Sequence, residues 1–116
     1  MGLTYIEGTV SNNGKSKPVK FLIDSGASYS VLPQEVWKGL KLKPKRSMSF
    51  TLADGTQIKR RISECHFALA GEEGHSPVIL GEPGDVALLG AVTLEIFGLV
   101  LNPFQRTLQP MTMHLA

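Results

Sequence analysis

Short stretches of apolar residues, rich in β-branched and aromatic types, recur along the chain and predict β-strands. Between the first two stretches, Asn13-Gly14 is a strong signal for a two-residue hairpin turn. Asp54-Gly55 marks the tip of a second hairpin, and a polar turn is expected over residues 71–75. The predicted strands cover residues 4–10, 19–23, 48–52, 58–62, 62–70, 78–80, 99–101 and 107–108.

Two short segments favour helix. Pro33 suits the first helical position ahead of residues 34–40, and Gly98 ends a second segment over residues 91–98. The 12 Gly and 7 Pro among 116 residues favour short strands and turns over long helices. The pattern therefore predicts an all-β class with one or two short helices, and the length predicts a single domain over residues 1–116.

Composition removes several classes of function. A hydrophobic share of 42% with 19% charged residues excludes a disordered chain. One Cys excludes an intrachain disulfide framework and a Cys-based zinc site, and the three His show no metal-ligand spacing, so we expect no metal. The apolar runs fall short of the roughly 18 residues that span a bilayer, and no signal peptide opens the sequence. We therefore expect no membrane partner and a cytoplasmic location.

Basic residues are concentrated in one part of the chain. Eight of the 12 Lys and Arg fall within residues 38–61, where Asp54 is the sole acid. Such a run is usually a solvated face, and without interleaved aromatic residues it gives little support to nucleic-acid binding. We therefore expect no nucleic-acid partner. Cys65 and His66 are adjacent, but neighbours on a strand point to opposite faces, so they cannot form a nucleophile–base dyad.

A carboxylate stands where a predicted apolar strand ends. Asp24 follows Leu22-Ile23 and precedes Ser25-Gly26. A simple turn after a strand is one interpretation, because Asp, Ser and Gly are all common in turns. The other is chemical: two facing carboxyl groups at hydrogen-bond distance cannot both ionise, so they share one proton. Such a pair can activate water and polarise a carbonyl without a metal or a covalent intermediate.

The order of the motifs resembles that of the retropepsin-like aspartic proteases, the family of the retroviral proteases and their cellular and bacterial relatives. The matching parts are Asp-Ser-Gly at residues 24–26, a glycine-tipped hairpin where the family has its flap, and Leu88-Leu89-Gly90 before a short helix. The resemblance covers most of residues 4–109. It implies an all-β, retropepsin-like, closed barrel-like acid-protease fold that works as a homodimer without a cofactor.

The resemblance also implies roles for individual residues. Asp24 is expected to be catalytic, and Ser25 to link the two identical loops of a dimer. The sequence has one Asp-Ser-Gly, so a complete site requires a second copy of the chain. The hairpin is expected to close as a flap over an extended peptide. The expected support for the catalytic loop is Ser25, Gly26, Leu88, Leu89 and Gly90, and the expected substrate-binding residues are Gly26, Ala27, Ser28, Ala53, Asp54, Gly55 and Thr56.

The expected function is an aspartic endopeptidase that cleaves extended segments of a peptide or protein, with its own precursor as one candidate substrate. The alternative is a non-catalytic dimerisation or peptide-binding module that keeps the fold. Ser28 and Ala91 stand where retroviral members often carry an acidic residue and an arginine, so that link at the dimer edge is absent here. A basic nucleic-acid binder ranks last.

Overall fold

The computed structural model describes residues 3–24, 26–112 and 114–115. Within these residues the chain forms nine strands and two short helices, and no helix among them is long and apolar enough to cross a membrane. In chain order the elements are β1 (Tyr5–Asn12), β2 (Lys15–Ile23), β3 (Ser30–Leu32), α1 (Gln34–Gly39), β4 (Arg46–Thr51), β5 (Gln57–Leu69), β6 (Glu72–Leu80), β7 (Leu88–Leu89), α2 (Ala91–Ile96), β8 (Leu99–Asn102) and β9 (Thr107–Pro110).

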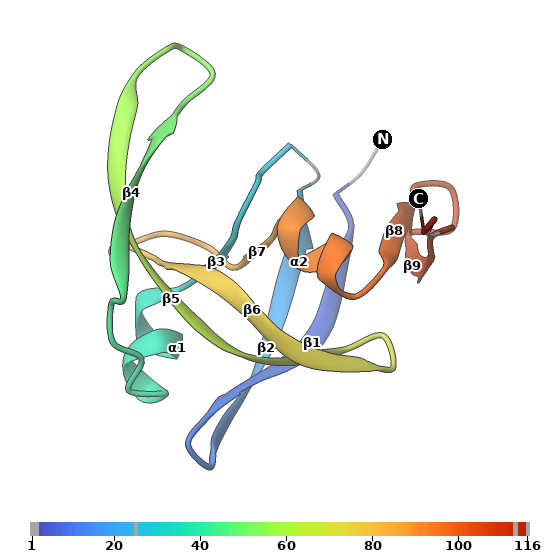
Figure 1. Cartoon of the computed structure of the whole chain (residues 1–116), viewed down its shortest axis with the longest axis horizontal. Helices are drawn as coiled ribbons and strands as arrows, with labels where there is room; N and C mark the ends of the chain where they lie inside the picture. The colour runs from blue at the N-terminus through green and yellow to red at the C-terminus, as the bar shows by residue number, and fades with distance from the viewer. Residues whose placement is uncertain (1–2, 25, 113, 116) are drawn as a thin grey trace.

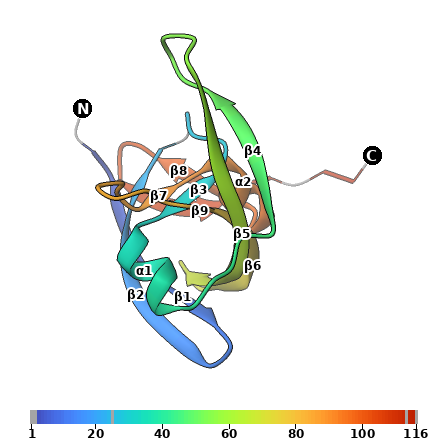
Figure 2. The same ribbon diagram turned by 90° about the vertical axis from the view of Figure 1, so that its left-hand side faces the viewer.

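Seven of the strands form one sheet in the order β1-β2-β7-β3-β6-β5-β4. β1 also pairs with β5, with Thr9 opposite Ala68, so the sheet curls back on itself into a barrel-like body (Figure 1). β8 and β9 form a separate two-stranded sheet beside it. The hairpin β4–β5 stands out from the body, as both views show (Figures 1 and 2). The predicted all-β class is therefore confirmed.

Two-residue turns with left-handed backbone connect the long hairpins. Asn13 and Gly14 have φ values of 48° and 81°, as the hairpin signal predicted. Ala70 and Gly71 adopt the same conformation, with φ values of 50° and 78°. The expected turn over residues 71–75 is therefore wrong: these two residues complete the turn, and β6 begins at Glu72.

β5 is one continuous strand of 13 residues, where the sequence suggested two consecutive strands. Its first half pairs with β4, with Ile58 opposite Phe50, and its second half pairs with β6, with Phe67 opposite Gly74. Because the same strand serves both partners, it carries the projecting hairpin directly on the body of the sheet.

The core lies inside the curled sheet. Phe21 and Phe67 are fully buried, and their rings stack with centroids 5.7 Å apart. Trp37 fixes the short helix α1 to this core, since its indole N–H donates to the Gly81 carbonyl at 2.9 Å. Cys65 is also buried, and burial raises the pKa of its thiol to about 12. His66, next to it, is only half-buried on the other face, as the strand alternation predicted.

We expect Phe67→Ala to lower the free energy of unfolding by about 3–5 kcal/mol, because it removes a fully buried ring and leaves a cavity. Phe104 is the matched control, since its side chain is 95% exposed. We expect Phe104→Ala to change that free energy by less than about 0.5 kcal/mol. Urea unfolding at a fixed protein concentration measures both, and equal losses would contradict this core.

Candidate active site

Asp24 lies where β2 ends, beside a second strand from the far half of the chain. β2 and β7 run parallel, with Leu22 opposite Leu88 and Ile23 opposite Leu89. The Asp24 amide continues this ladder by donating to the Leu89 carbonyl at 3.1 Å. The structure thus brings together the two segments that the sequence motifs singled out.

The Asp24 carboxylate is held by its own loop. The Gly26 amide donates to Oδ1 at 3.0 Å, and the Ala27 amide donates to the Asp24 main-chain carbonyl at 3.1 Å. Ser25 lies outside the described residues. Asp24 is exposed and lines an open groove.

Gly90 holds the other side of this loop. A Cβ at residue 90 would lie 2.6 Å from the Tyr29 carbonyl carbon and 2.9 Å from the Ser28 oxygen, so no other side chain fits. Beyond Gly90, the first amides of α2 donate to the loop: Ala91 to the Ala27 carbonyl and Val92 to the Ser28 carbonyl, each at 2.9 Å. The main chain of α2 therefore fixes the segment that follows Asp24, although Ser28 and Ala91 offer no charged link.

A buried hydroxyl cluster supports Gly90, and sequence reasoning did not find it. The Gly90 amide donates to Ser30 Oγ at 3.0 Å. The Ser30 hydroxyl lies 2.6 Å from Thr93 Oγ1, and Ser76 Oγ lies 2.8 Å from that same atom. The cluster ties β3, β6 and α2 together beneath the loop that follows Asp24. Its only sequence signal is hydroxyl residues at otherwise apolar positions, which does not reveal that they meet.

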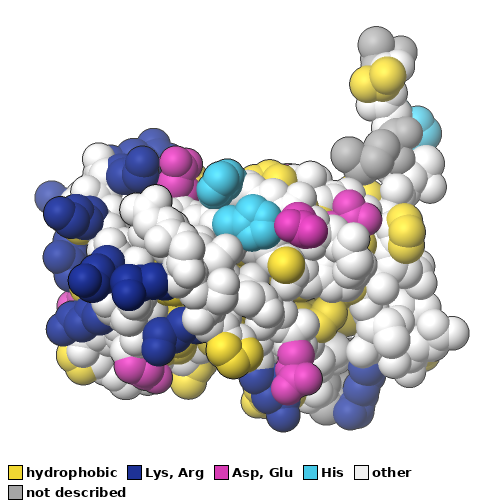
Figure 3. Space-filling view, turned by 90° about the horizontal axis from the view of Figure 1, so that it is seen from below, with side chains coloured by type: hydrophobic (Ala, Val, Ile, Leu, Met, Phe, Trp, Pro, Cys, Tyr) yellow, Lys and Arg dark blue, Asp and Glu magenta, His cyan; other side chains and the backbone are white. Residues whose placement is uncertain are grey.

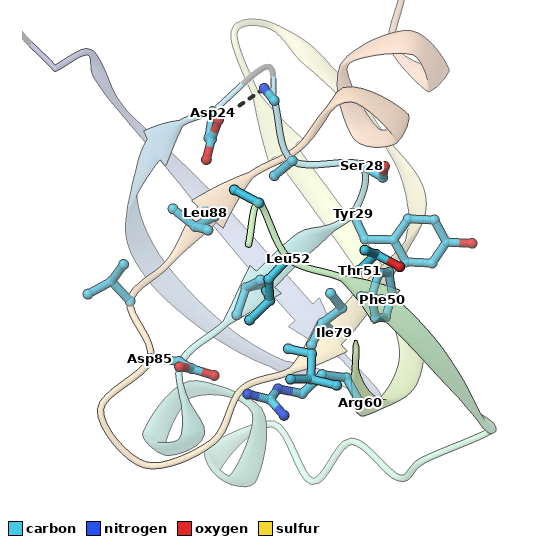
Figure 4. A pocket seen from close by; sticks show the side chains of 16 residues that line it. Asp24, Ser28, Tyr29, Phe50, Thr51, Leu52, Arg60, Ile79, Asp85 and Leu88 are labelled. Carbon is cyan, nitrogen blue, oxygen red and sulfur yellow. Dashed lines mark hydrogen bonds between the residues drawn. The ribbon is translucent and has the colours of Figure 1, made fainter. Parts of the chain in front are cut away.

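A groove of about 650 Å³ runs from Asp24 along the half of the hairpin β4–β5 that is nearer its turn. Of the expected substrate-binding residues, four line it and three, at the hairpin tip, do not. Figure 4 shows Asp24 at one end and Asp85 and Arg60 at the other, with Leu88 and Leu52 between. The lining consists of Asp24, Gly26, Ala27, Ser28, Tyr29, Val31, Phe50, Thr51, Leu52, Ala53, Ile58, Arg60, Ile79, Asp85, Val86 and Leu88.

The tip of the hairpin is a compact polar turn beyond the groove. The Thr56 amide donates to Asp54 Oδ1 at 2.9 Å, and this hydrogen bond lowers the pKa of the Asp54 carboxyl. The Gly55 amide donates to the Leu52 carbonyl at 2.9 Å. Asp54, Gly55 and Thr56 therefore lie outside the lining of the groove.

Tyr29 connects the hairpin with the loop that follows Asp24. Its ring packs edge-on against Phe50 of β4 with centroids 5.9 Å apart, and its hydroxyl accepts a hydrogen bond from Arg46 at 3.2 Å. Neither Tyr29 nor Phe50 was among the expected site residues, because nothing in the sequence pairs them. In the part of the chain that the structure describes, no group of three or more His, Cys, Asp or Glu side chains could hold a metal ion.

This geometry defines a class: a mostly β domain with a carboxylate directly after a strand whose last residues pack into the core, lining a groove beside a projecting hairpin. Residues 6–92 match the family model described as "Aspartyl protease", so the chain belongs to the aspartyl protease family. No curated protein matches the sequence.

Two solved structures of viral proteases share the fold. The solution structure of the simian foamy virus (mac) protease matches with a TM-score of 0.57 and 20% identity, over 78% of this chain and 91% of that chain. The EIAV protease in complex with the inhibitor HBY-793 matches with a TM-score of 0.63 and 18% identity, over 84% of this chain and 89% of that chain. The resemblance to the retropepsin-like proteases is thereby confirmed.

We expect Gly90→Ala to lower the free energy of unfolding by about 1–3 kcal/mol, because the new Cβ would overlap backbone atoms of Ser28 and Tyr29 that cannot move independently. Gly26→Ala is the control: among the described residues its Cβ would meet Asp24 Oδ1 alone, at 3.3 Å, and that side chain can shift. Urea unfolding of both variants tests this difference. A loss as large for Gly26→Ala as for Gly90→Ala would contradict it.

Proposed function

We propose that the chain is one half of a homodimeric aspartic endopeptidase, with one Asp24 from each copy forming the catalytic pair. The observation that carries the proposal is the position of Asp24: it follows a strand whose last residues pack into the core, is anchored by main-chain hydrogen bonds, and lies at one end of a groove. Membership of the aspartyl protease family supports the same reading.

The chemistry follows from two carboxyl groups placed face to face. Because both cannot ionise at close range, one keeps a proton. The ionised Asp24 takes a proton from water, which attacks the scissile carbonyl, while the protonated one donates a hydrogen bond to the carbonyl oxygen. The Gly26 amide, 3.0 Å from Asp24 Oδ1, keeps the carboxylate oriented for this exchange.

Apolar residues near Asp24 support a contact with a second copy. The Ile23 amide donates to the Thr4 carbonyl at 2.9 Å, so the first described residues run beside the end of β2. There Leu3 is 64% exposed and Tyr5 is 48% exposed. An apolar rim around an unshielded carboxylate suits an isologous interface that buries both.

The substrate of this enzyme would be an extended peptide. The groove walls are largely apolar, with Val31, Ile79 and Leu88 below and Phe50 and Ile58 of the hairpin above. Such walls accept apolar side chains on both sides of the cleaved bond. Movement of the hairpin toward Asp24 would bring its tip onto the peptide and exclude water.

We expect Asp24→Asn to lower kcat/KM for peptide hydrolysis at mildly acidic pH by about 10²–10⁴-fold, because the amide can neither accept nor share the catalytic proton. Glu72→Gln, at an exposed position where β6 begins, serves as the control and should retain the native rate. Pepstatin should inhibit the native chain. Equal hydrolysis by the native chain and Asp24→Asn would refute the proposal. Peptide binding without turnover, unchanged by this substitution, would favour a non-catalytic module.

A shared site also predicts how copies combine. We expect specific activity to fall on dilution, since dissociation separates the two carboxylates. Adding inactive Asp24→Asn to a fixed amount of native chain should lower its activity, because each mixed dimer holds a single aspartate. The same addition of Glu72→Gln should raise total activity. Activity that is independent of concentration and untouched by Asp24→Asn would rule out the shared site.

A further inference from the structure

One cation projects into the groove that leads away from Asp24. Among the described residues of the lining, Arg60 is the sole Lys or Arg. It lies on β5 opposite Met48 and on the same face as Ile58, so it belongs to the inner, largely apolar face of the hairpin. Arg60 is half-buried, whereas Lys59 and Arg61, which point to the outer face, are exposed.

The guanidinium of Arg60 has unused hydrogen-bonding capacity. It carries five N–H donors, and one of them, on Nη1, reaches the adjacent Lys59 carbonyl at 3.2 Å. The ion pairs found within the described residues are Lys45–Glu64 and His66–Glu73, so Arg60 is outside both.

Asp85 lies at the same end of the groove as Arg60 (Figure 4). One oxygen of its carboxylate, Oδ2, accepts a hydrogen bond from the Glu82 amide at 2.8 Å. This bond closes the loop between β6 and β7. Because this carboxylate is engaged with its own loop and forms no ion pair with Arg60 within the described residues, the guanidinium stays available to a ligand in the groove.

We propose that Arg60 receives an acidic side chain of the substrate, so that the protease selects Glu or Asp at a position away from the cleaved bond. The proposal rests on the proposed endopeptidase function. A planar guanidinium binds a carboxylate through two parallel hydrogen bonds, and in a partly buried groove this pairing is stronger than in water. Since each copy of a dimer supplies one Arg60, we expect one such position on each side of the cleaved bond.

The charge distribution of the chain acts in the same direction. Residues 38–61 contain eight Lys and Arg and one Asp, while the rest of the chain contains four Lys and Arg and nine Asp and Glu. Figure 3 shows these cationic side chains gathered on the side of the molecule where α1 and the hairpin β4–β5 lie. The positive potential of the hairpin would attract acidic peptides, and Arg60 would then bind the carboxylate inside the groove.

The test begins from an apolar parent peptide that the native protease cleaves. At each of the four positions on either side of the cleaved bond, matched peptides carry Glu, Gln or Lys, and kcat/KM is measured for all of them. At one position on each side we expect Glu to exceed Gln by about tenfold, the discrimination that a charge-assisted hydrogen-bonded pair provides. Added salt should reduce this ratio.

Variants assign the preference to Arg60. Arg60→Gln should bring the Glu-to-Gln ratio close to one, and Arg60→Glu should make Lys the preferred residue at the same positions. Lys59→Gln is the matched control: it removes the same charge from the outer face of the same strand and should leave the ratio unchanged. Thermal unfolding of each variant confirms that it is folded.

Two results with the native protease would overturn the role of Arg60 in substrate selection. A ratio near one at all positions, or a native preference for Lys that points to Asp85 instead, would overturn the inference while hydrolysis of the parent peptide upholds the endopeptidase. If the native chain cleaves no peptide, fluorescence anisotropy measures binding of the labelled peptides instead. Tighter binding of a Glu peptide than of its Gln match, lost in Arg60→Gln, then supports the assignment to Arg60, and equal binding overturns it.

Discussion

The parallel pairing between β2 and β7 is the interaction on which the rest of the structure depends. It sets Leu22 opposite Leu88, and the Asp24 amide then reaches the Leu89 carbonyl. Parallel neighbours need a long connection between them. Here that connection contains the hairpin β4–β5, so the hairpin and Asp24 line the same groove. The close approach of Gly90 to Tyr29 follows, because the chain leaving β7 must pass directly behind the loop.

The buried hydroxyl groups beneath the loop that follows Asp24 are all hydrogen-bonded. Ser30, Ser76 and Thr93 come from three elements and share hydroxyl contacts beneath Gly90. In the part of the chain that the structure describes, no buried side-chain nitrogen or oxygen is left without a partner. Since an unsatisfied hydroxyl there would be costly, each member restrains the other two. The loop that carries Asp24 thus rests on a rigid base, while the hairpin that would cover it projects from the body.

Local sequence rules predicted the Asn13-Gly14 turn, whereas contacts between distant segments depend on long-range packing, which those rules do not describe. Asn13 and Gly14 need no tertiary contact to favour a hairpin, so the sequence alone located that turn. The motif order likewise indicated that Asp24 and Leu89 belong together. The contact between Tyr29 and Phe50 joins separate segments whose pairing depends on the curl of the sheet, which no local pattern encodes. The turn between β5 and β6 was placed too late because Ala70, a residue type that is rarely left-handed, occupies its first position.

The basic stretch shows why a charged run on a strand is not one surface. Averaged over residues 38–61, it looks like a solvated face, and for most of its members the structure agrees, since Lys59 and Arg61 are exposed. Strand alternation, however, turns Arg60 the other way, toward the apolar face that it shares with Ile58. A half-buried guanidinium among apolar groups gains more from an approaching anion than a fully solvated one does. The average charge of residues 38–61 does not distinguish Arg60 from its neighbours. The alternation of side chains along β5 does, because it places Arg60 on the inner face.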